Sequence, residues 1–506
     1  MDGMRVGDRS LRARATRGSA KRPASVSSSA TQAVPRSVAA LATAVAVLLG
    51  GVGCVRYRAA PVIAGMAAAS LEDRRLDDRG LTAFAGANHV EAWPPEEWDL
   101  DALTLAAFYF HPDLDVARAR WAVARAGVIT VGARPNPTLH LGPVEYVTPT
   151  HESSPWIFGF SLDVPVETFG KRGYRIAQAR ATGESARLGI AAAAWKVRSR
   201  LRVALLDLWA AEARSAVVQR EQALREEILQ MLDRRLALGE ADRAEATRER
   251  IAVLRVRTSL RDSERHIAEA RAHVAGAVGL PIEALDGRKL SRGRFDVLPP
   301  PALLGEPTLR RAALVGRADV RAGLAEYEAA EAALQLEVAR QYPDLQLGPG
   351  YSWEQGASHF AVGLGIALPV LSRNRGPIAE AEAKRAEVGA RFTALQARIL
   401  AEVDAATQPY EAASRANLAA EATLTSQQEA SAQTAARFRA GETDRLELRT
   451  AELEVVAAEQ AWLDAVLARQ QALSALEDAL QRPLFGSLQP FPELQRSPRG
   501  TGEESP

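Results

Sequence analysis

The 506-residue chain carries 63 basic and 62 acidic side chains and a single cysteine. A net charge of +1 gives no sign of the basic surface that nucleic-acid binding requires, so we expect no nucleic-acid partner. One cysteine excludes a framework of internal disulfides.

Residues 1–53 have the composition of an export signal. They carry eight basic and two acidic side chains, and an apolar run extends from Val38 to Leu49. This run is too short to span a bilayer but fits the core of a signal peptide. Cys54 follows small residues, as in the bacterial lipobox, although Gly51 stands where leucine is usual. We expect a lipid-anchored Cys54; the alternative is an ordinary cleaved signal with an incidental cysteine.

The rest of the chain reads as two copies of one unit. Four stretches recur in the same order: ARPNPTLHLGP (133–143) and ARQYPDLQLGP (339–349), FSLDVPVETFGKRG (160–173) and LGIALPVLSRNRG (364–376), RRLALGEADRAEATRERI (234–251) and RFRAGETDRLELRTAEL (437–453), VAGAVGLP (274–281) and LEDALQRP (476–483). A period of this length excludes short solenoid repeats. The expected parts are an N-terminal extension (54–99), repeat 1 (100–295), a Pro-rich linker (296–306), repeat 2 (307–487) and a disordered tail (488–506).

Each unit contains strands, expected at about 138–165 and 344–369. In FAVGLGIAL (360–368) every second residue is large and apolar and the others are glycine or alanine, which is the period of a β-strand. WIFGFSLDV (156–164) alternates in the same way. One complete apolar face suits strands that cross a bilayer; the alternative is a hairpin packed on soluble helices. An open sheet edge in hydrocarbon leaves backbone groups unpaired, so the membrane interpretation predicts an oligomer whose chains pool their strands.

Very long helices are expected after the strands, at about 173–238 and 376–440. Proline is absent from the first segment, and an apolar stripe with spacings of three and four residues runs along the second. At about 1.5 Å per residue, each helix would be roughly 100 Å long. Pro409 should bend or locally break the second helix. Shorter helices are expected at about 242–277 and 308–340.

Hinge loops, at 239–242 and 441–444, follow the two long helices. Gly239 and Gly441 suit the left-handed position after a helix end. Asp242 and Asp444 suit the N-cap of the next helix. Glu447 falls where its carboxylate can reach back to the N-cap backbone. A simple turn between two helices would explain all five residues.

No catalytic or metal-binding constellation is recognisable in the sequence. The HExxH, phosphate-loop and Gly-x-Ser-x-Gly motifs are absent, and no two of the seven histidines stand four residues apart. We therefore expect no enzymatic activity, no cofactor and no metal site.

The duplicated unit, the strand–Pro–Val element before each long helix and the RxxxG hinges together resemble the TolC-type outer-membrane efflux proteins. The string IALPVLSRNRGPIAEAEAKR (366–385) is similar to this element in the heavy-metal subgroup. The resemblance covers nearly all of the mature chain. It implies a mainly α-helical homotrimer in which a twelve-stranded membrane β-barrel continues into an α-helical tunnel.

The resemblance also implies a function, that of a passive exit duct in a tripartite efflux system. Such a duct stands in the outer membrane of a Gram-negative bacterium and extends into the periplasm. Its implied partners are the outer-membrane lipid, a periplasmic adaptor protein and an inner-membrane transporter. Lipid-anchored members of the family are consistent with Cys54. The alternative is a periplasmic coiled-coil structural or adaptor protein without a pore, although an adaptor would carry one helical hairpin flanked by small β-domains.

In the family the hinge tips contact the adaptor, which here implies contacts by Arg235, Gly239, Asp242, Arg437, Gly441 and Asp444. A carboxylate six residues after the second hinge glycine lies at the constricted periplasmic gate of some members, and Glu447 holds this position. Thr450 replaces the second carboxylate that some members have, which puts a double acidic ring in doubt. The exported substrate is not indicated by any residue.

Overall fold

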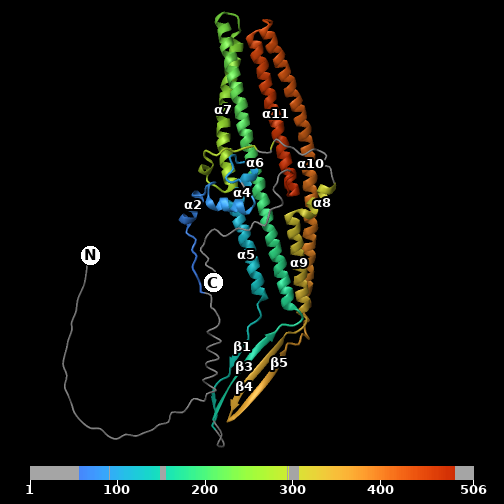
Figure 1. The fold of residues 1–506 in the computed structure, drawn as a ribbon. Coiled ribbons are helices and arrows are strands. Elements are labelled where there is room, and N and C mark those ends of the chain that lie inside the picture. Colours follow the sequence, from blue (N-terminus) through green and yellow to red (C-terminus); the bar gives the residue numbers. More distant parts are fainter. Residues whose placement is uncertain (1–55, 91, 149–154, 293–294, 296–306, 485–506) are drawn as a thin grey trace, which may run out of the picture. The chain divides into compact units, whose positions relative to one another are not determined.

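The computed structural model describes residues 56–90, 92–148, 155–292, 295 and 307–484 (Figure 1). The chain divides into two compact units, residues 1–64 and 65–506, and the fold below is that of the second. Three predicted features lie outside the described residues: the signal segment with Cys54, the linker and the C-terminal tail.

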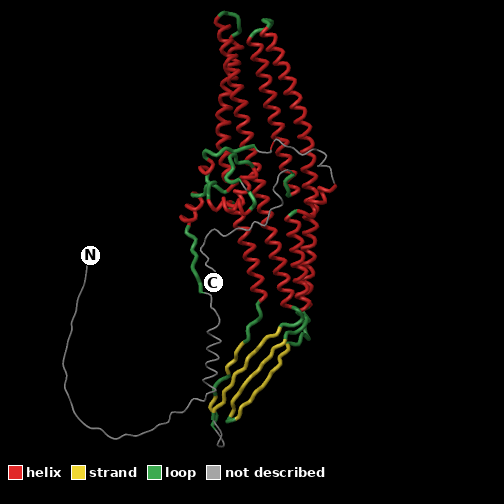
Figure 2. The backbone as a smooth tube through the Cα atoms, viewed as in Figure 1, coloured by secondary structure: helices red, strands yellow, loops and turns green. Residues whose placement is uncertain are grey.

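Helices dominate the structure, and the sheet is small (Figure 2). The helices are α2 (Ala64–Glu72), α3 (Arg79–Ala87), α4 (Leu100–Phe110), α5 (Pro112–Gly132), α6 (Lys171–Ala237), α7 (Arg243–Val278), the short 3-10 helix η1 (Ile282–Leu285), α8 (Pro307–Gly316), α9 (Ala318–Ala339), α10 (Arg375–Arg439) and α11 (Arg445–Leu480). Within the described ranges, no helix combines the length and the apolar character that crossing a membrane requires. The prediction of a mainly helical chain is confirmed.

The sheet is antiparallel, with the strand order β1-β3-β4-β5 and with β2 also paired to β3. Its strands are β1 (Thr138–Leu141), β2 (Glu145–Tyr146), β3 (Trp156–Val166), β4 (Leu345–Glu354) and β5 (Ala357–Ile366). Phe160 pairs with Tyr351, which pairs with Phe360, so large side chains line up on one face of the sheet. The first expected strand segment is interrupted between β1 and β2, and residues 149–154 lie outside the described part.

The two long helices, α6 and α10, connect the sheet to the hinge loops (Figure 1). Helices α5 and α9 pack beside the half of α6 that is nearest the sheet. Helices α7 and α11 pack beside the half that is nearest the hinges. Helix α6 contacts α5, α7, α9 and α11, and therefore lies in the middle of the helical layer. The larger hydrophobic core joins α4, α6, α7 and α11 near the midpoint of the long helices.

The expected single helix at about 308–340 is two helices, α8 and α9, which meet at Arg317. The buried Arg317 guanidinium donates to the Glu402 carboxylate at 2.9 Å and to the Ala479 carbonyl at 2.7 Å. Arg317 therefore ties the break to both α10 and α11. Gly316 ends α8 directly before this position and is a poor helix former, so the sequence carried a local signal for the break. The contacts of Arg317 then hold the chain in the turn.

The expected local break at Pro409 is not found, because α10 continues through this residue. Proline removes one helical hydrogen bond and normally disfavours a helix interior. Here Val403, Ala406 and Tyr410 are buried in the core that α10 shares with α8 and α11. We attribute the unbroken helix to this packing on both sides of the proline.

Candidate functional site: the two hinge loops

The hinge glycines end the long helices in the same way. Gly239 has φ +75°, and the next residue, Glu240, donates its backbone N–H to the Arg235 carbonyl at 2.8 Å. Gly239 itself donates to the Leu236 carbonyl at 3.1 Å. These two bonds form a Schellman motif, which satisfies carbonyls that the helix end would leave unpaired.

The second hinge repeats this geometry at Gly441, where φ is +76°. Glu442 donates to the Arg437 carbonyl at 3.0 Å, and Gly441 donates to the Phe438 carbonyl at 3.1 Å. A Cβ added at Gly239 or Gly441 would meet no atom within 4 Å. Backbone conformation, rather than lack of space, therefore makes glycine the preferred residue at both positions.

Both expected N-caps are confirmed. The Asp242 carboxylate accepts the Ala244 N–H at 3.2 Å at the start of α7, and the Asp444 carboxylate accepts the Glu447 N–H at 2.8 Å at the start of α11. Each cap satisfies one of the amide groups that a helix N-terminus leaves open. Each hinge therefore reverses the chain with local chemistry alone.

The Glu447 side chain does not make the expected bond back to the N-cap backbone in the described structure. Its carboxylate instead accepts from Arg437 at 3.2 Å and from the Thr443 hydroxyl. A charge-assisted bond from a guanidinium is stronger than one from a neutral amide, which explains the preference. Glu447 thus joins the two helices of its own hairpin, and about half of its side chain remains exposed.

The structure also joins the two hairpins to each other. Arg235, at the end of α6, donates to the Asp444 carboxylate at 2.6 Å. Behind this pair, Leu446 packs against a small core that includes Ile228 and Leu232. Two residues from opposite repeats, each expected at a separate tip, therefore meet in one contact.

Sequence reasoning missed a second connection between the hairpins. Glu227 of α6 accepts from Arg449 at 2.8 Å and from Arg445 at 3.3 Å, both on α11. The four-residue spacing of the two arginines places them on one face of α11. That spacing was the available signal, but no pattern in the chain identifies Glu227 as the partner.

The charge of Asp444 depends on these contacts. The Arg235 guanidinium lowers the pKa of Asp444, and the backbone N–H of Glu447 lowers it further. In return, the Asp444 carboxylate raises the pKa of Arg235. Both groups are therefore ionised near neutral pH. Among the described residues, no three His, Cys, Asp or Glu side chains are grouped so as to hold a metal ion.

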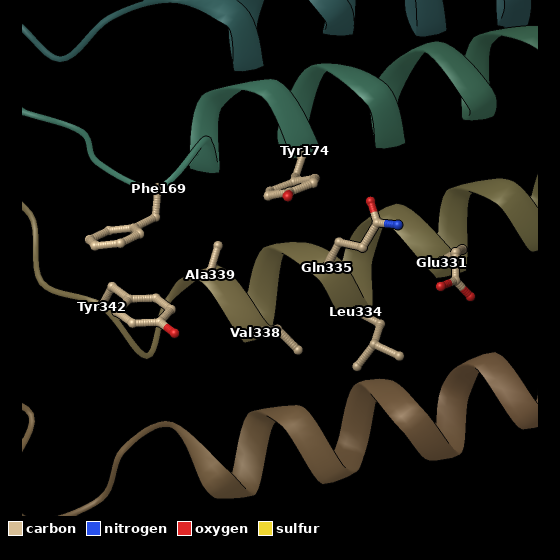
Figure 3. Close-up of a pocket in the computed structure, with 8 residues that line it drawn as sticks. All are labelled: Phe169, Tyr174, Glu331, Leu334, Gln335, Val338, Ala339 and Tyr342. Atoms are coloured by element: carbon tan, nitrogen blue, oxygen red, sulfur yellow. The ribbon is translucent and has the colours of Figure 1, made fainter.

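A pocket of about 380 Å³ lies at the other end of the helices, between the start of α6 and the end of α9 (Figure 3). The Phe169 and Tyr342 rings stack there with their centroids 4.1 Å apart. Tyr174 reaches from α6 towards α9, and Glu331 at the far end is paired with Arg385 at 3.1 Å. The lining is mostly apolar, and its one acid is already paired, so we assign the pocket no chemistry.

Comparison with known proteins gives one family. A family model described as outer membrane efflux protein matches residues 109–280 and 309–481, which together are more than half of the chain. The cobalt-zinc-cadmium resistance protein CzcC of Cupriavidus metallidurans is 27% identical over 218 residues, which are 42% of this chain and 50% of that protein. The chain thus spans about half the length of this curated relative.

Solved structures share the fold at low sequence identity. The outer membrane protein VceC of Vibrio cholerae superposes with a TM-score of 0.60 at 20% identity, over 75% of this chain and 95% of its own. The outer membrane channel MtrE of Neisseria gonorrhoeae, in its open state, gives 0.59 at 18% identity, over 76% and 89%. At these identities the likeness concerns the fold.

Proposed function

Since the chain belongs to the outer membrane efflux protein family, we propose that it is the outer-membrane channel of a tripartite efflux system. It conducts substrates passively from the periplasmic side to the exterior, and the energy comes from an inner-membrane transporter. The match of the family model to both halves of the chain carries this proposal. The sheet on one end of long helices, with capped hinge loops at the other, supports it (Figure 1).

The proposal includes assembly as a homotrimer, in which four main strands from each chain close a barrel of twelve. The strand order leaves β1 and β5 at the two edges of the described sheet. Phe360 on β5 is 84% exposed, whereas its row neighbour Phe160 on the inner strand β3 is 38% exposed. An unpaired apolar edge strand invites pairing with another chain, which supports strand pooling.

A duplicated unit underlies this assembly in the proposal. Helix α7 begins at Arg243 and ends at Val278, and α11 begins and ends 202 residues later, at Arg445 and Leu480. The two matches of one family model support the same division. We keep the repeats at 100–295 and 307–487.

The hinge tips are the proposed contacts with a periplasmic adaptor. The residues of the first tip are Arg235, Gly239 and Asp242, and those of the second are Arg437, Gly441 and Asp444. Their support is that both loops are closed by their own caps and are exposed. Glu447 is proposed to contribute to the periplasmic gate, and its half-exposed carboxylate supports this role.

The substrate is proposed from a relative alone. CzcC is named for cobalt, zinc and cadmium resistance, so divalent transition-metal ions are the first substrates to test. Such ions would be cargo, and an exit duct needs no fixed ligands for them.

The main experiment expresses the chain with its own leader and fractionates the membranes. We expect a detergent-extracted trimer in the outer membrane that forms ion-conducting pores in planar bilayers. Recovery as a soluble periplasmic protein, or a purified oligomer without conductance, would favour the coiled-coil protein without a pore. Zinc and cobalt tolerance of a deletion strain, with and without the gene, then tests the substrate.

Lipid attachment at Cys54 is a separate part of the proposal. Mass spectrometry of the mature N-terminus should find a diacylglyceryl cysteine, and Cys54→Ser should remove it. An unmodified N-terminus at another residue would leave the channel proposal intact and remove the anchor.

A further inference from the structure

A clasp at the sheet joins the two halves of the chain. Thr168, just after β3, donates its hydroxyl to the Pro343 carbonyl at 2.6 Å and its N–H to the Asp344 carboxylate at 3.0 Å. The buried Lys171 donates its ammonium to the same carboxylate at 2.8 Å and to the Tyr342 carbonyl at 2.7 Å. This clasp holds the start of α6 against the segment that leads into β4.

The second half of the chain carries a matching set of donors that is not engaged in the described structure. Counting 204 residues on from Thr168 and Lys171 gives Ser372 and Arg375, again a hydroxyl and a cation. Both are exposed, and neither has a side-chain hydrogen bond or ion pair among the described residues.

The backbone supports this equivalence of the two strand-to-helix junctions. Phe169 and Gly170 have φ values of +55° and +74°, and their counterparts Arg373 and Asn374 have +46° and +56°. Two consecutive residues in this region are uncommon outside glycine. Both junctions therefore present the hydroxyl and the cation from the same local backbone shape.

The matching acceptors stand at the opposite edge of the chain. Counting 206 residues back from Tyr342, Pro343 and Asp344 gives Asn136, Pro137 and Thr138, at the start of the edge strand β1. The carbonyls of Asn136 and Pro137 are the counterparts of the Tyr342 and Pro343 carbonyls that Lys171 and Thr168 bind. The Asp344 carboxylate has no counterpart, because Thr138 carries a hydroxyl in its place. The donors lie beside the edge strand β5 and the acceptors beside β1, and β3 and β4 separate these edges. One chain cannot bring them together, but two chains side by side can.

Strand pairing within the chain supplies the register for such a contact. Val164 of β3 pairs with Leu347 of β4. The same offsets convert this pair into Leu368, two residues beyond the end of β5, and Leu141, the last residue of β1. These side chains are 73% and 76% exposed.

Side-chain alternation restricts the register independently. Leu368 and Leu141 are both apolar, whereas their chain neighbours His140 and Pro369 would fall together on the other face. If the pairing between the two chains shifted by one residue, Leu368 and Leu141 would point to opposite faces of the sheet. The competing registers are therefore those shifted by an even number of residues, of which a shift of two is the nearest.

The hinge end of the molecule gives a second check. The ion pair Arg235–Asp444 joins the halves within the chain. An offset of 202 residues converts it into Arg437 and Asp242, which again have opposite charges.

One of the two neighbouring contacts behaves in the same way. Glu227–Arg445 becomes Glu429 and Arg243, again a carboxylate and a guanidinium, and neither has an ion pair within the described part of the chain. The closer contact, Glu227–Arg449, becomes Glu429 and Thr247 and does not keep its cation. Further from the hinges the charges are not kept. Arg214 of α6 pairs with Asp464 of α11, and the residue 202 positions after Arg214 is Ala416, which has no charge. The β5–α10 edge of the chain thus carries hydrogen-bond donors near the sheet and charged side chains near the hinge. The opposite edge carries carbonyl acceptors near the sheet and opposite charges near the hinge.

We propose that a second copy of this chain docks on the β5–α10 edge in the register that the chain uses internally. Leu368 pairs with Leu141 of the second copy, and Ser372 and Arg375 clasp the carbonyls of its residues 136 and 137. This inference rests on the proposed pooling of strands and specifies which residues meet.

Paired cysteines test the register in the full-length protein in its membrane. In the double variant Leu141→Cys/Leu368→Cys, copper-phenanthroline should join neighbouring chains into a ladder on non-reducing gels. Links within one chain are too long, since three strand spacings of about 4.8 Å separate β1 from β5 and a disulfide needs Cα atoms within about 7 Å. Two slipped pairs, Leu141→Cys/Ile366→Cys and Leu141→Cys/Val370→Cys, are the matched controls, and the single variants control for Cys54.

We expect at least about fivefold more cross-linked chain from the first pair than from either slipped pair, because a two-residue slip moves the Cα atoms beyond disulfide reach. If a slipped pair cross-linked and the Leu141→Cys/Leu368→Cys pair did not, the proposed register would be wrong. The register would also be wrong if no pair links while the double variant remains a trimer in detergent, and the channel proposal would then stand. If the unmodified protein were a monomer in detergent, the chains would not pool their strands, and this inference would be wrong as well.

Discussion

At the scale of single residues, the hinges separate backbone requirements from side-chain contacts. Gly441 is needed for its positive φ, since a Cβ would have open space around it. Glu447 is held by Arg437 and Thr443, contacts that other side chains could replace only in part. Substitutions at these two positions should therefore fail for different reasons.

Gly441→Val should prevent efflux without preventing export. A β-branched residue is strongly disfavoured at φ +76°, so the turn between α10 and α11 must rearrange. Gly441→Asn, which tolerates this conformation, should keep most of the activity. Gly287→Val is the matched strain control, because Gly287 also has a positive φ (+69°) with open space but lies outside the hinges. Metal tolerance and outer-membrane abundance are measured together, and unchanged tolerance for Gly441→Val would show that the turn is not required.

Glu447→Gln should reduce the preference of the pore for cations while changing stability by less than about 1 kcal/mol, since exposed ion pairs contribute little. The charge lost is half exposed, and its N-cap partner Asp444 is untouched. Reversal potentials in a salt gradient give the selectivity. Glu245→Gln, at the equivalent position of the other hinge, should change neither property. Equal selectivity for both variants would leave Glu447 with a structural role alone.

At the scale of elements, the two hairpins are held together at their tips by charges near the surface. Arg235 binds Asp444, and Glu227 binds Arg449 and Arg445. Only a small apolar core, with Ile228 and Leu232, lies behind these pairs. The contact between the tips therefore depends on carboxylates that acid can neutralise.

The contact between the hairpin tips should weaken in acid. The pKa of Asp444 is lowered in the fold, so its contribution is complete above the unfolded value of about 3.9 and is lost as pH falls through the folded value. Spin labels at the two hinge loops should report a longer distance once the pH is below the folded pKa of Asp444, which itself lies below about 3.9, than at pH 7. Asp444→Asn keeps an N-cap but lacks the charge, and should show the longer distance at both values. A distance in the unmodified protein that does not change with pH would contradict this account.

At the scale of the whole molecule, a buried polar cluster joins the two halves near their middle. Glu477 of α11 accepts from Arg202 at 2.6 Å and from Arg198 at 3.4 Å, both on α6. Its other oxygen accepts the N–H of Leu484 at 2.9 Å. Burial lowers the pKa of Arg202, although Glu477 opposes the shift. The helices of both halves thus share one buried carboxylate.

Glu477→Ala should cost about 3–5 kcal/mol, because it leaves two buried guanidinium groups without their carboxylate. Asp464→Ala is the matched control on the same helix; it removes the exposed partner of Arg214 and should cost about 0–1 kcal/mol. The temperature or denaturant concentration at which the oligomer dissociates measures both. If both variants lowered the dissociation temperature or denaturant concentration equally, the buried cluster would contribute no more to stability than the exposed pair.

The sequence by itself determined the features that depend on near neighbours in the chain. Period-two alternation located β3 and β5, and the order of glycine and aspartate located both hinges and their caps. These features follow from backbone geometry and from bonds that span only a few residues. Tertiary structure decided the rest. Arg317 holds the turn between α8 and α9 through its bonds to α10 and α11, and α10 passes through Pro409 because its neighbours are packed. Asp444 meets Arg235 only because two hairpins lie side by side, and no local pattern encodes a contact between residues 209 positions apart.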